Sequence, residues 1–425
     1  MILFNGKLLS EEKLNTVLEG MPDFCIQTIE KGKIRASEVL DACAALAEKI
    51  QEGVYDAVLK PLLAQGVFTE RQLAEAVVFF QRENLEYKYQ TELGCLIENG
   101  EYLDTARGSR IRRRYMPLGI LLHIAAGNAE GLPFYSVIEG LLAGNINLLK
   151  LPSTDDGVSV FLLQELVKTE PKLAPYISVF DIPSTNLALL KKLGSLADAI
   201  VVWGGDEAVR AARNLADPAT QIISWGHKLS FAYLTPDAGE EELRALAAHI
   251  CATNQLLCSS CQGLFVDTED MAVVEEIGRR FLALLEEESR HVPGLPLGIR
   301  GKVSISLYNE ELEASATARK VLRGKGVSVI LAEDSTLELS YLFRNCWVKP
   351  LPRTQIVKAL KHNRGYLQTA GLVCPQEDRA YLEEQLFKAG VVRVTGAAHM
   401  SEMRAGEAHD GMYPIRRYSR VVESI

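Results

Sequence analysis

Apolar residues follow a helical rhythm in the first quarter of the chain. Within residues 1–105, the segments 37–52 and 70–82 repeat apolar side chains every three to four positions, which predicts amphipathic helices. Ser37 and Thr69 stand at positions typical of helix N-caps. We therefore expect residues 1–105 to be mainly helical.

A different pattern begins near residue 118 and continues to about residue 235. Short apolar runs at 118–125, 146–151, 177–182 and 199–203 alternate with helical patterns at 132–142, 155–168, 186–193 and from 206 onward. Nearly continuous apolar strands joined by helices are typical of a parallel sheet with helices on both faces. The pattern predicts a doubly wound, Rossmann-type nucleotide-binding fold.

A second α/β region is expected between residues 227 and 395. Its predicted strands include 231–234, 264–267, 303–307 and 327–331, with long helices at 240–252 and 271–288. Residues 396–425 are rich in turns and end in a charged, extended tail. We expect an α/β protein of four parts, with boundaries at 1–110, 111–226, 227–395 and 396–425.

Composition narrows the class of protein. The 425 residues carry a net charge of −9, so no nucleic-acid partner is expected, because such a partner usually requires a basic domain. No run approaches the ~18 uncharged apolar residues of a membrane span, and the N-terminus lacks the apolar core of a signal peptide. The 8 cysteines are sparse, which indicates reduced thiols and a cytoplasmic protein.

One basic run interrupts this acidic chain. It comprises Arg107, Arg110, Arg112, Arg113 and Arg114. The run is equally compatible with a solvated strand or loop and with a surface that attracts an anionic ligand such as a nucleotide phosphate.

Two thiols stand close together after a predicted helix and before a predicted strand. Cys258 and Cys261 lie among small and polar residues on what we expect to be a loop. A thiol held on such a loop can act as a nucleophile. The alternatives are a structural cysteine, a redox pair or half of a zinc site, but no second pair of metal ligands accompanies them, so no metal is expected.

Three further candidates follow predicted strands of the nucleotide-binding region. Asn128 comes after the strand at 118–125 and can donate to an oxyanion, although an asparagine that closes a turn is the simpler interpretation. Lys150 ends the next strand, where ligands bind such sheets, or is a solvated strand end. Gly204 and Gly205 precede a helix and leave room for a phosphate, but no GxGxxG fingerprint is present.

Taken in order, these segments resemble the aldehyde dehydrogenase superfamily from about residue 110 onward. The similar elements are Pro117-Leu118-Gly119 through Asn128, Gly144-Asn145 through Lys150, Trp203-Gly204-Gly205, Gly226-His227-Lys228, and Asn254-Gln255 with Cys258. The resemblance implies a cofactor domain at 111–226 packed by the helical residues 1–110. It also implies a catalytic domain at 227–395 and a C-terminal segment at 396–425 that returns to the cofactor domain and supports oligomerisation.

Within the superfamily, the chain looks most like the long-chain acyl-CoA reductases, which include the fatty acid reductase of bacterial bioluminescence. The shared residues are Cys258-Ser259-Ser260, Gln262 and His409-Asp410-Gly411, whereas Cys261 replaces a proline of many relatives. The resemblance implies NADPH-dependent reduction of an acyl-CoA to an aldehyde, with release of CoA. The acyl group would pass through a thioester on Cys258, and Asn128 would hold the oxyanion.

Departures from ordinary aldehyde dehydrogenases agree with that reaction. Ser224 or Trp225 occupies the place of the glutamate that activates water in hydrolytic members, and neither is a general base at neutral pH. The glutamate that grips the nicotinamide ribose is also missing from the similar region 343–350. Ser153 replaces an acidic residue of NAD-preferring relatives, which favours NADP while leaving NAD possible.

The resemblance also supplies the remaining expectations. Cofactor contacts would come from Lys150, Ser153, Gly204, Gly205 and Gly226, and the assembly would be a homodimer or homotetramer. A CoA-acylating aldehyde dehydrogenase, an acyl-phosphate reductase and a non-catalytic partner subunit remain alternatives. The sequence does not identify the group that lowers the pKa of the nucleophile, for which two histidines, at positions 123 and 227, are candidates by position only.

Overall fold

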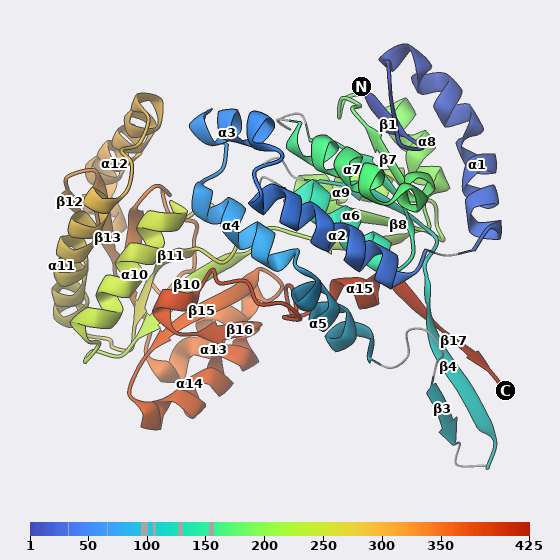
Figure 1. Cartoon of the computed structure of the whole chain (residues 1–425). Helices are drawn as coiled ribbons and strands as arrows, with labels where there is room; N and C mark the ends of the chain where they lie inside the picture. The colour runs from blue at the N-terminus through green and yellow to red at the C-terminus, as the bar shows by residue number, and fades with distance from the viewer. Residues whose placement is uncertain (33, 66, 95–100, 105–107, 126–130, 153–156) are drawn as a thin grey trace. The chain divides into compact units, whose positions relative to one another are not determined.

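The chain forms two compact units, each built around its own seven-stranded sheet (Figure 1). The computed structural model describes residues 1–32, 34–65, 67–94, 101–104, 108–125, 131–152 and 157–425. The first unit contains residues 1–226 and 403–425, and the second contains residues 227–402. No helix in the described part of the chain has the length and apolar content needed to cross a membrane.

The central sheet of the first unit is parallel over five strands. In spatial order these are β7 (Ile177–Phe180), β6 (Ile146–Lys150), β5 (Ile120–Ile124), β8 (Ala199–Trp203) and β9 (Gln221–Trp225). The chain runs outward from β5 to β7 and then returns to β8, so the switch point lies between β5 and β8. Ligands of such sheets bind at the carboxyl ends of the strands beside this point.

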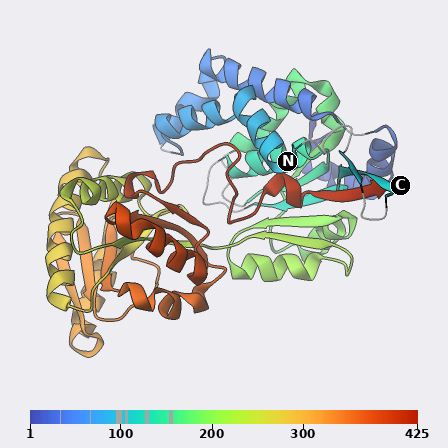
Figure 2. The ribbon, with the colours of Figure 1, turned by 90° about the horizontal axis from the view of Figure 1, so that it is seen from below.

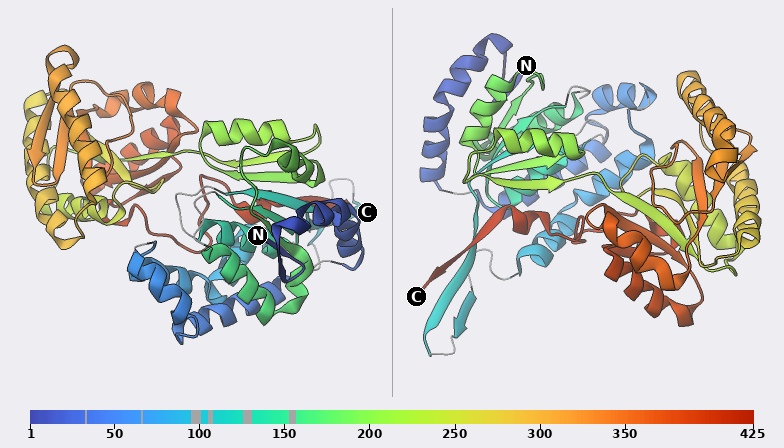
Figure 3. Two further views of the ribbon diagram at one scale, coloured as in Figure 1. Left: turned by 90° about the horizontal axis from the view of Figure 1, so that it is seen from above. Right: turned by 180° about the vertical axis from the view of Figure 1, so that it is seen from behind.

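Helices cover both faces of this sheet (Figures 2 and 3). On one face, α2 (Ala36–Gln51), α6 (Leu132–Leu142) and α7 (Val158–Thr169) pack against one another, and on the other α8 (Leu187–Leu196) packs against α9 (Asp206–Leu215). Strands β6, β7 and β8 are buried along their whole length, because apolar side chains point to both faces. The predicted doubly wound α/β fold is confirmed.

The N-terminal residues are mostly helical but begin with a hairpin. β1 (Ile2–Phe4) pairs antiparallel with β7 and with β2 (Lys7–Leu9), and α1 (Leu14–Glu30), α3 (Asp56–Gln65), α4 (Glu70–Phe79) and α5 (Arg82–Leu93) follow. The predicted N-cap at Thr69 is confirmed, since its side chain accepts from the Gln72 N–H. The N-cap at Ser37 is wrong, because α2 already begins at Ala36.

A small antiparallel sheet joins the middle of the first unit's chain to its C-terminal strand. β4 (Arg110–Pro117) lies between β3 (Glu101–Asp104) and β17 (Ser419–Ser424). The basic run lies on β4, where Arg113 pairs with Glu423 at 2.5 Å and Arg110 and Arg112 lie over the Tyr102 ring. Arg107 lies outside the described residues. The other four arginines lie on this strand, and attraction of an anionic ligand stays a prediction.

A buried ionic cluster holds the returning C-terminal segment. Lys88 of α5 contacts Glu92 and lies 3.0 Å from Glu139 of α6, with all three side chains nearly inaccessible to solvent. Glu92 also accepts from the backbone N–H of Ile415 in α15 (Pro414–Arg417) at 2.7 Å. Buried charges need such partners, so this cluster links α5, α6 and α15.

The second unit has a mixed sheet covered on both faces (Figure 3). Its order is β12 (Arg319–Gly324), β13 (Val327–Ala332), β14 (Asn345–Pro350), β11 (Cys261–Val266), β10 (Leu229–Leu234), β15 (Leu367–Val373) and β16 (Arg393–Thr395), with only β12 antiparallel. α10 (Glu240–Thr253) and α11 (Met271–Glu288) bury one face. α13 (Ile356–Leu360) and α14 (Gln376–Ala389) bury the other.

One predicted strand is wrong. Residues 303–307 lie inside α12 (Leu297–Thr317). The Val-Ser-Ile-Ser-Leu alternation fits a strand, yet Leu307 and Glu310 are buried while Ile305 is 65% exposed. Burial of two positions three residues apart fits the helical spacing, and it overrides the local alternation.

Candidate active site

The strongest candidate for chemistry is a thiol at the amino end of a buried strand. Cys258 belongs to the segment 254–260, here called the nucleophile loop, which links the end of α10 to β11. Cys258 is exposed, and so are the two preceding residues, Leu256 (47%) and Leu257 (38%). The loop thus presents a thiol beside two apolar side chains on the surface of the second unit.

Buried, hydrogen-bonded residues lie at or next to both ends of the nucleophile loop. Gln255 is 1% exposed, and its amide donates to the carbonyl oxygens of Cys261 (3.1 Å) and Gln262 (3.3 Å). At the other end, the Ser260 hydroxyl accepts from the Leu257 N–H at 3.1 Å. A loop anchored in this way fixes the direction of its exposed tip.

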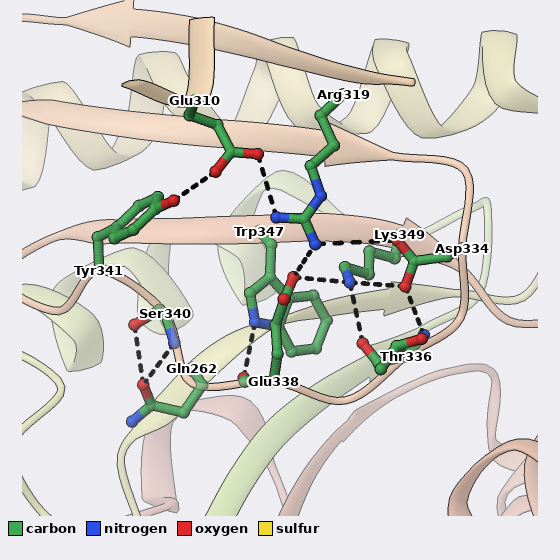
Figure 4. Close-up of polar contacts among 10 residues, drawn as sticks. All are labelled: Gln262, Glu310, Arg319, Asp334, Thr336, Glu338, Ser340, Tyr341, Trp347 and Lys349. Carbon is green, nitrogen blue, oxygen red and sulfur yellow. Dashed lines mark hydrogen bonds and ion pairs between the residues drawn. The ribbon is translucent and has the colours of Figure 1, made fainter. Parts of the chain in front are cut away.

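A second amide ties the start of β11 to a neighbouring segment. The Gln262 Oε1 atom accepts from the backbone N–H and the hydroxyl of Ser340, at 3.3 and 2.8 Å (Figure 4). Its Nε2 atom donates to the carbonyl oxygens of Gln255 (3.1 Å) and Ser260 (3.4 Å). Gln255 and Gln262 therefore brace each other beneath the thiol.

The two thiols of the motif differ in their surroundings. Cys261 is the first residue of β11 rather than a loop residue, is fully buried, and its Sγ atom lies 3.2 Å from the Gly263 carbonyl oxygen. Burial raises its pKa to about 12, which keeps it protonated and unreactive. The expectation that both thiols share the loop is wrong, and of the two only Cys258 is exposed.

The other candidates lie in the first unit, at one edge of its sheet. Lys150 ends β6, Gly204 and Gly205 follow β8, and Gly226 follows β9. The Gly204 N–H donates to the Trp225 carbonyl at 3.1 Å, and a Cβ on Gly204 would lie 2.9 Å from Ala208. Only glycine fits there, since φ is +153° as well.

This edge has features of a dinucleotide site. The Lys150 side chain is largely buried, its Nζ donates to the Ser184 hydroxyl at 3.0 Å, and burial lowers its pKa. Among the described residues no carboxylate forms an ion pair with Lys150, and such a lysine can donate to ribose hydroxyls. Asp206 and Glu207, however, occupy the first turn of α9, which disfavours a phosphate at that helix N-terminus.

Aromatic residues from three of these motifs also gather at this edge, together with Tyr418, which no motif had indicated. The His409 ring lies 5.1 Å from the rings of both Trp203 and Trp225, and the Trp225 indole donates to the Tyr418 hydroxyl at 3.1 Å. Trp225 is thus buried as a donor, in agreement with its exclusion as a base. In the C-terminal segment, only the His-Asp-Gly motif at 409–411 had indicated a functional role.

His123 is a structural histidine. Its two ring nitrogens contact the Ser136 hydroxyl (2.7 Å) and the Asn147 amide oxygen (2.9 Å). It is fully buried, and burial lowers its pKa to about 4, so the ring is neutral. Asn128 and Ser153, the proposed oxyanion and cofactor residues, lie outside the described residues.

Comparison with known proteins decides the family. A model of the acyl-CoA reductase (LuxC) family matches residues 32–421. The chain belongs to this family. It is 26% identical over 311 residues to "Long-chain acyl-protein thioester reductase 2" of Photobacterium leiognathi, covering 71% of this chain and 63% of that protein. Over 355 residues it is 25% identical to the long-chain acyl-protein thioester reductase of Vibrio harveyi, covering 82% and 72%.

The match therefore spans slightly less than two thirds of the first relative's length.

Solved structures give the fold. A 3,6-anhydro-L-galactose dehydrogenase in complex with NAP superposes with a TM-score of 0.69 at 15% identity, covering 97% of this chain and 91% of that one. An NAD-dependent benzaldehyde dehydrogenase of Corynebacterium glutamicum gives 0.68 at 14%, covering 98% and 91%. The fold is that of the aldehyde dehydrogenases, as expected.

Proposed function

We propose that this acyl-CoA reductase family member reduces an acyl thioester to an aldehyde through a covalent intermediate on Cys258. The observation that carries the proposal is the exposed Cys258 thiol on a loop whose two ends are buried and braced. Holding a nucleophile in a fixed direction is a large part of covalent catalysis. The buried Cys261 offers no competing nucleophile.

The chain's own residues would act in a defined order. The Cys258 sulfur attacks the acyl carbonyl, the carbon–sulfur bond of the donor breaks, and the donor thiol leaves with a proton. The Cys258 backbone N–H and the Asn128 amide hold the oxyanion of this step. When bound, the reduced nicotinamide supplies the hydride. With that hydride on the acyl carbon and a proton from water on its oxygen, Cys258 carries a thiohemiacetal, whose carbon–sulfur bond breaks to release the aldehyde and restore the thiol.

The cofactor is proposed to be NADP, held at the carboxyl edge of the first sheet. Lys150, Gly204, Gly205 and Gly226 would contact it, with Ser153 near the adenine ribose in place of a carboxylate. The missing carboxylate favours a 2′-phosphate, and NAD is the alternative. Replacing Ser153 by Asp should shift the preference in kcat/KM from NADPH towards NADH.

Two acyl donors are compatible with the proposal. We favour acyl-CoA, while the curated relatives are named for acyl-protein thioesters. The proposal also includes a homodimer or homotetramer. It includes a reducing, cytoplasmic location too, since the cysteines of the described residues form no disulfide.

The test is aldehyde formation from a C4–C16 series of acyl-CoA and acyl-protein thioesters with NADPH. We expect turnover by the wild type and by Cys374→Ala, a control thiol remote in sequence, and none by Cys258→Ala. Turnover with one donor class alone identifies the donor. Equal turnover by Cys258→Ala would refute the assignment, and turnover with acyl phosphates alone would favour an acyl-phosphate reductase.

A further inference from the structure

Two segments with left-handed backbone conformations face each other at the nucleophile loop. Asn254 (φ 47°) and Gln255 (φ 63°) begin that loop, and Leu342 (φ 59°), Phe343 (φ 50°) and Arg344 (φ 74°) precede β14. Elsewhere in the described residues, only three residues other than glycine have positive φ. Such conformations persist only where the surroundings enforce them, and they concentrate at functional sites.

Hydrogen bonds join the two segments directly. The Phe343 N–H donates to the Asn254 carbonyl at 3.0 Å. The Gln255 Oε1 atom accepts from the N–H groups of Arg344 (3.0 Å) and Asn345 (3.2 Å). Gln255 therefore links β14 to β11, because its amide nitrogen donates to the start of β11. The left-handed conformations of 342–344 aim these donors at the loop.

The Arg344 side chain completes the contact from within the protein. Arg344 is 5% exposed, its Nε donates to the Asn254 side-chain oxygen at 3.1 Å, and an Nη atom donates to the Pro293 carbonyl at 2.7 Å. Within the described part of the chain its hydrogen-bond partners are neutral, and no carboxylate pairs with it. Burying a guanidinium without a counter-charge is costly. Stability alone does not explain why an arginine occupies this position.

We propose that Arg344 is a positioning residue for Cys258. Arg344 holds the nucleophile loop through Asn254, so that the Cys258 thiol points at the acyl carbonyl. This inference rests on the proposed function only in taking Cys258 as the nucleophile. Asn254 suits the role because asparagine tolerates the left-handed conformation better than most residues. The guanidinium reaches both its side chain and the 293 carbonyl, which a lysine cannot do with the same planar geometry.

The experiment compares Arg344→Met with Arg353→Met, a matched control in the same unit. Arg353 pairs with Asp267 and Asp378 at 2.6 and 2.8 Å, at the carboxyl end of β11, away from the nucleophile loop. We expect Arg344→Met to lower kcat about a hundredfold, as for a misplaced reacting group, with KM within about twofold. Arg353→Met should lower the melting temperature but leave kcat within about twofold of wild type.

Two further variants separate positioning from folding. Asn254→Gly retains the left-handed conformation but removes the oxygen that Arg344 contacts, so kcat should fall in the same direction. The double variant should be no slower than Arg344→Met alone, because both changes break one contact. Methylguanidine added to Arg344→Ala should restore part of kcat. Restored turnover identifies the missing group as the guanidinium.

The alkylation rate of Cys258 with iodoacetamide keeps the two proposals distinguishable. If the wild type reduces no thioester, the proposed function fails. The positioning role is still supported in that case if the alkylation rate of Cys258 changes in Arg344→Met but not in Arg353→Met. If the wild type is active and Arg344→Met keeps kcat within about threefold, the positioning role is overturned. An equal loss of kcat in Arg353→Met would also overturn it.

Discussion

Gly263 and Trp347 offer a test of how tightly the second unit is packed below the nucleophile loop. Gly263 of β11 pairs with Trp347 of β14, and a Cβ atom added to Gly263 would lie 2.1 Å from the indole Cδ2 atom. The indole is 2% exposed, its Nε1 donates to the Glu338 carbonyl at 3.1 Å, and the Phe265 ring lies 4.7 Å away. We predict that Gly263→Ala is strongly destabilising.

The size of the effect follows from the contacts. An ordinary contact of at least 3.4 Å requires the indole to move by about 1.3 Å. Overpacking of this kind costs about 1–3 kcal/mol, and loss of the Glu338 hydrogen bond adds about 1 kcal/mol. Gly263→Ala should therefore lose roughly 2–4 kcal/mol, or about 4–16 °C in melting temperature for a domain of this size.

Differential scanning calorimetry provides the assay. Gly298→Ala in α12 is the matched control, because nothing lies within 4 Å of its added Cβ. That change should be neutral or stabilising by about 0.5–1 kcal/mol, as for glycine to alanine in a helix. Trp347→Leu, which makes room, should suppress the effect of Gly263→Ala in the double variant. A Gly263→Ala protein within 0.5 kcal/mol of wild type, on about the scale of a tolerated surface change, would refute the packing argument.

Three other predictions concern the two sites and the network of Figure 4. Iodoacetamide should label Cys258 much faster than Cys261, because only Cys258 is exposed, and peptide mapping checks this. Lys150→Met should weaken NADPH binding about tenfold without changing the melting temperature upward or downward by more than about 2 °C, as measured by fluorescence titration and calorimetry. Lys349→Met removes a fully buried ammonium that lies 2.9 Å from Asp334 and 2.7 Å from Glu338, so urea unfolding should show a loss of about 2–3 kcal/mol.

The sequence predicted elements best where burial and local pattern agree. α6, α11 and β8 were expected with the bounds that they have, since buried strands and amphipathic helices leave clear patterns. The sequence did not predict elements whose conformation is set by tertiary contacts. β1 and β2 are too short to show a period, and residues 303–307 alternate like a strand but are held in α12 by burial of Leu307.

The candidate site shows the same division. Motifs that occur in the same order as in the superfamily singled out four candidates, Cys258, Lys150, Gly204 and Gly226. Arg344 could not, since its role depends on a contact across 90 residues with Asn254. The local sequence also could not show that Cys258 is exposed and Cys261 buried. The reason is that β11 begins at Cys261, whereas the strand was expected to start at Leu264.

Intact-protein mass spectrometry tests most directly whether Cys258 carries the acyl group. Wild type and Cys258→Ala are incubated with an acyl thioester, without and with NADPH. We expect one acyl adduct on the wild type, none on Cys258→Ala, and discharge of the adduct to aldehyde when NADPH is added. Two results would contradict this assignment. One is an acyl adduct on Cys258→Ala, and the other is a wild type that forms aldehyde with NADPH but shows no adduct when NADPH is left out.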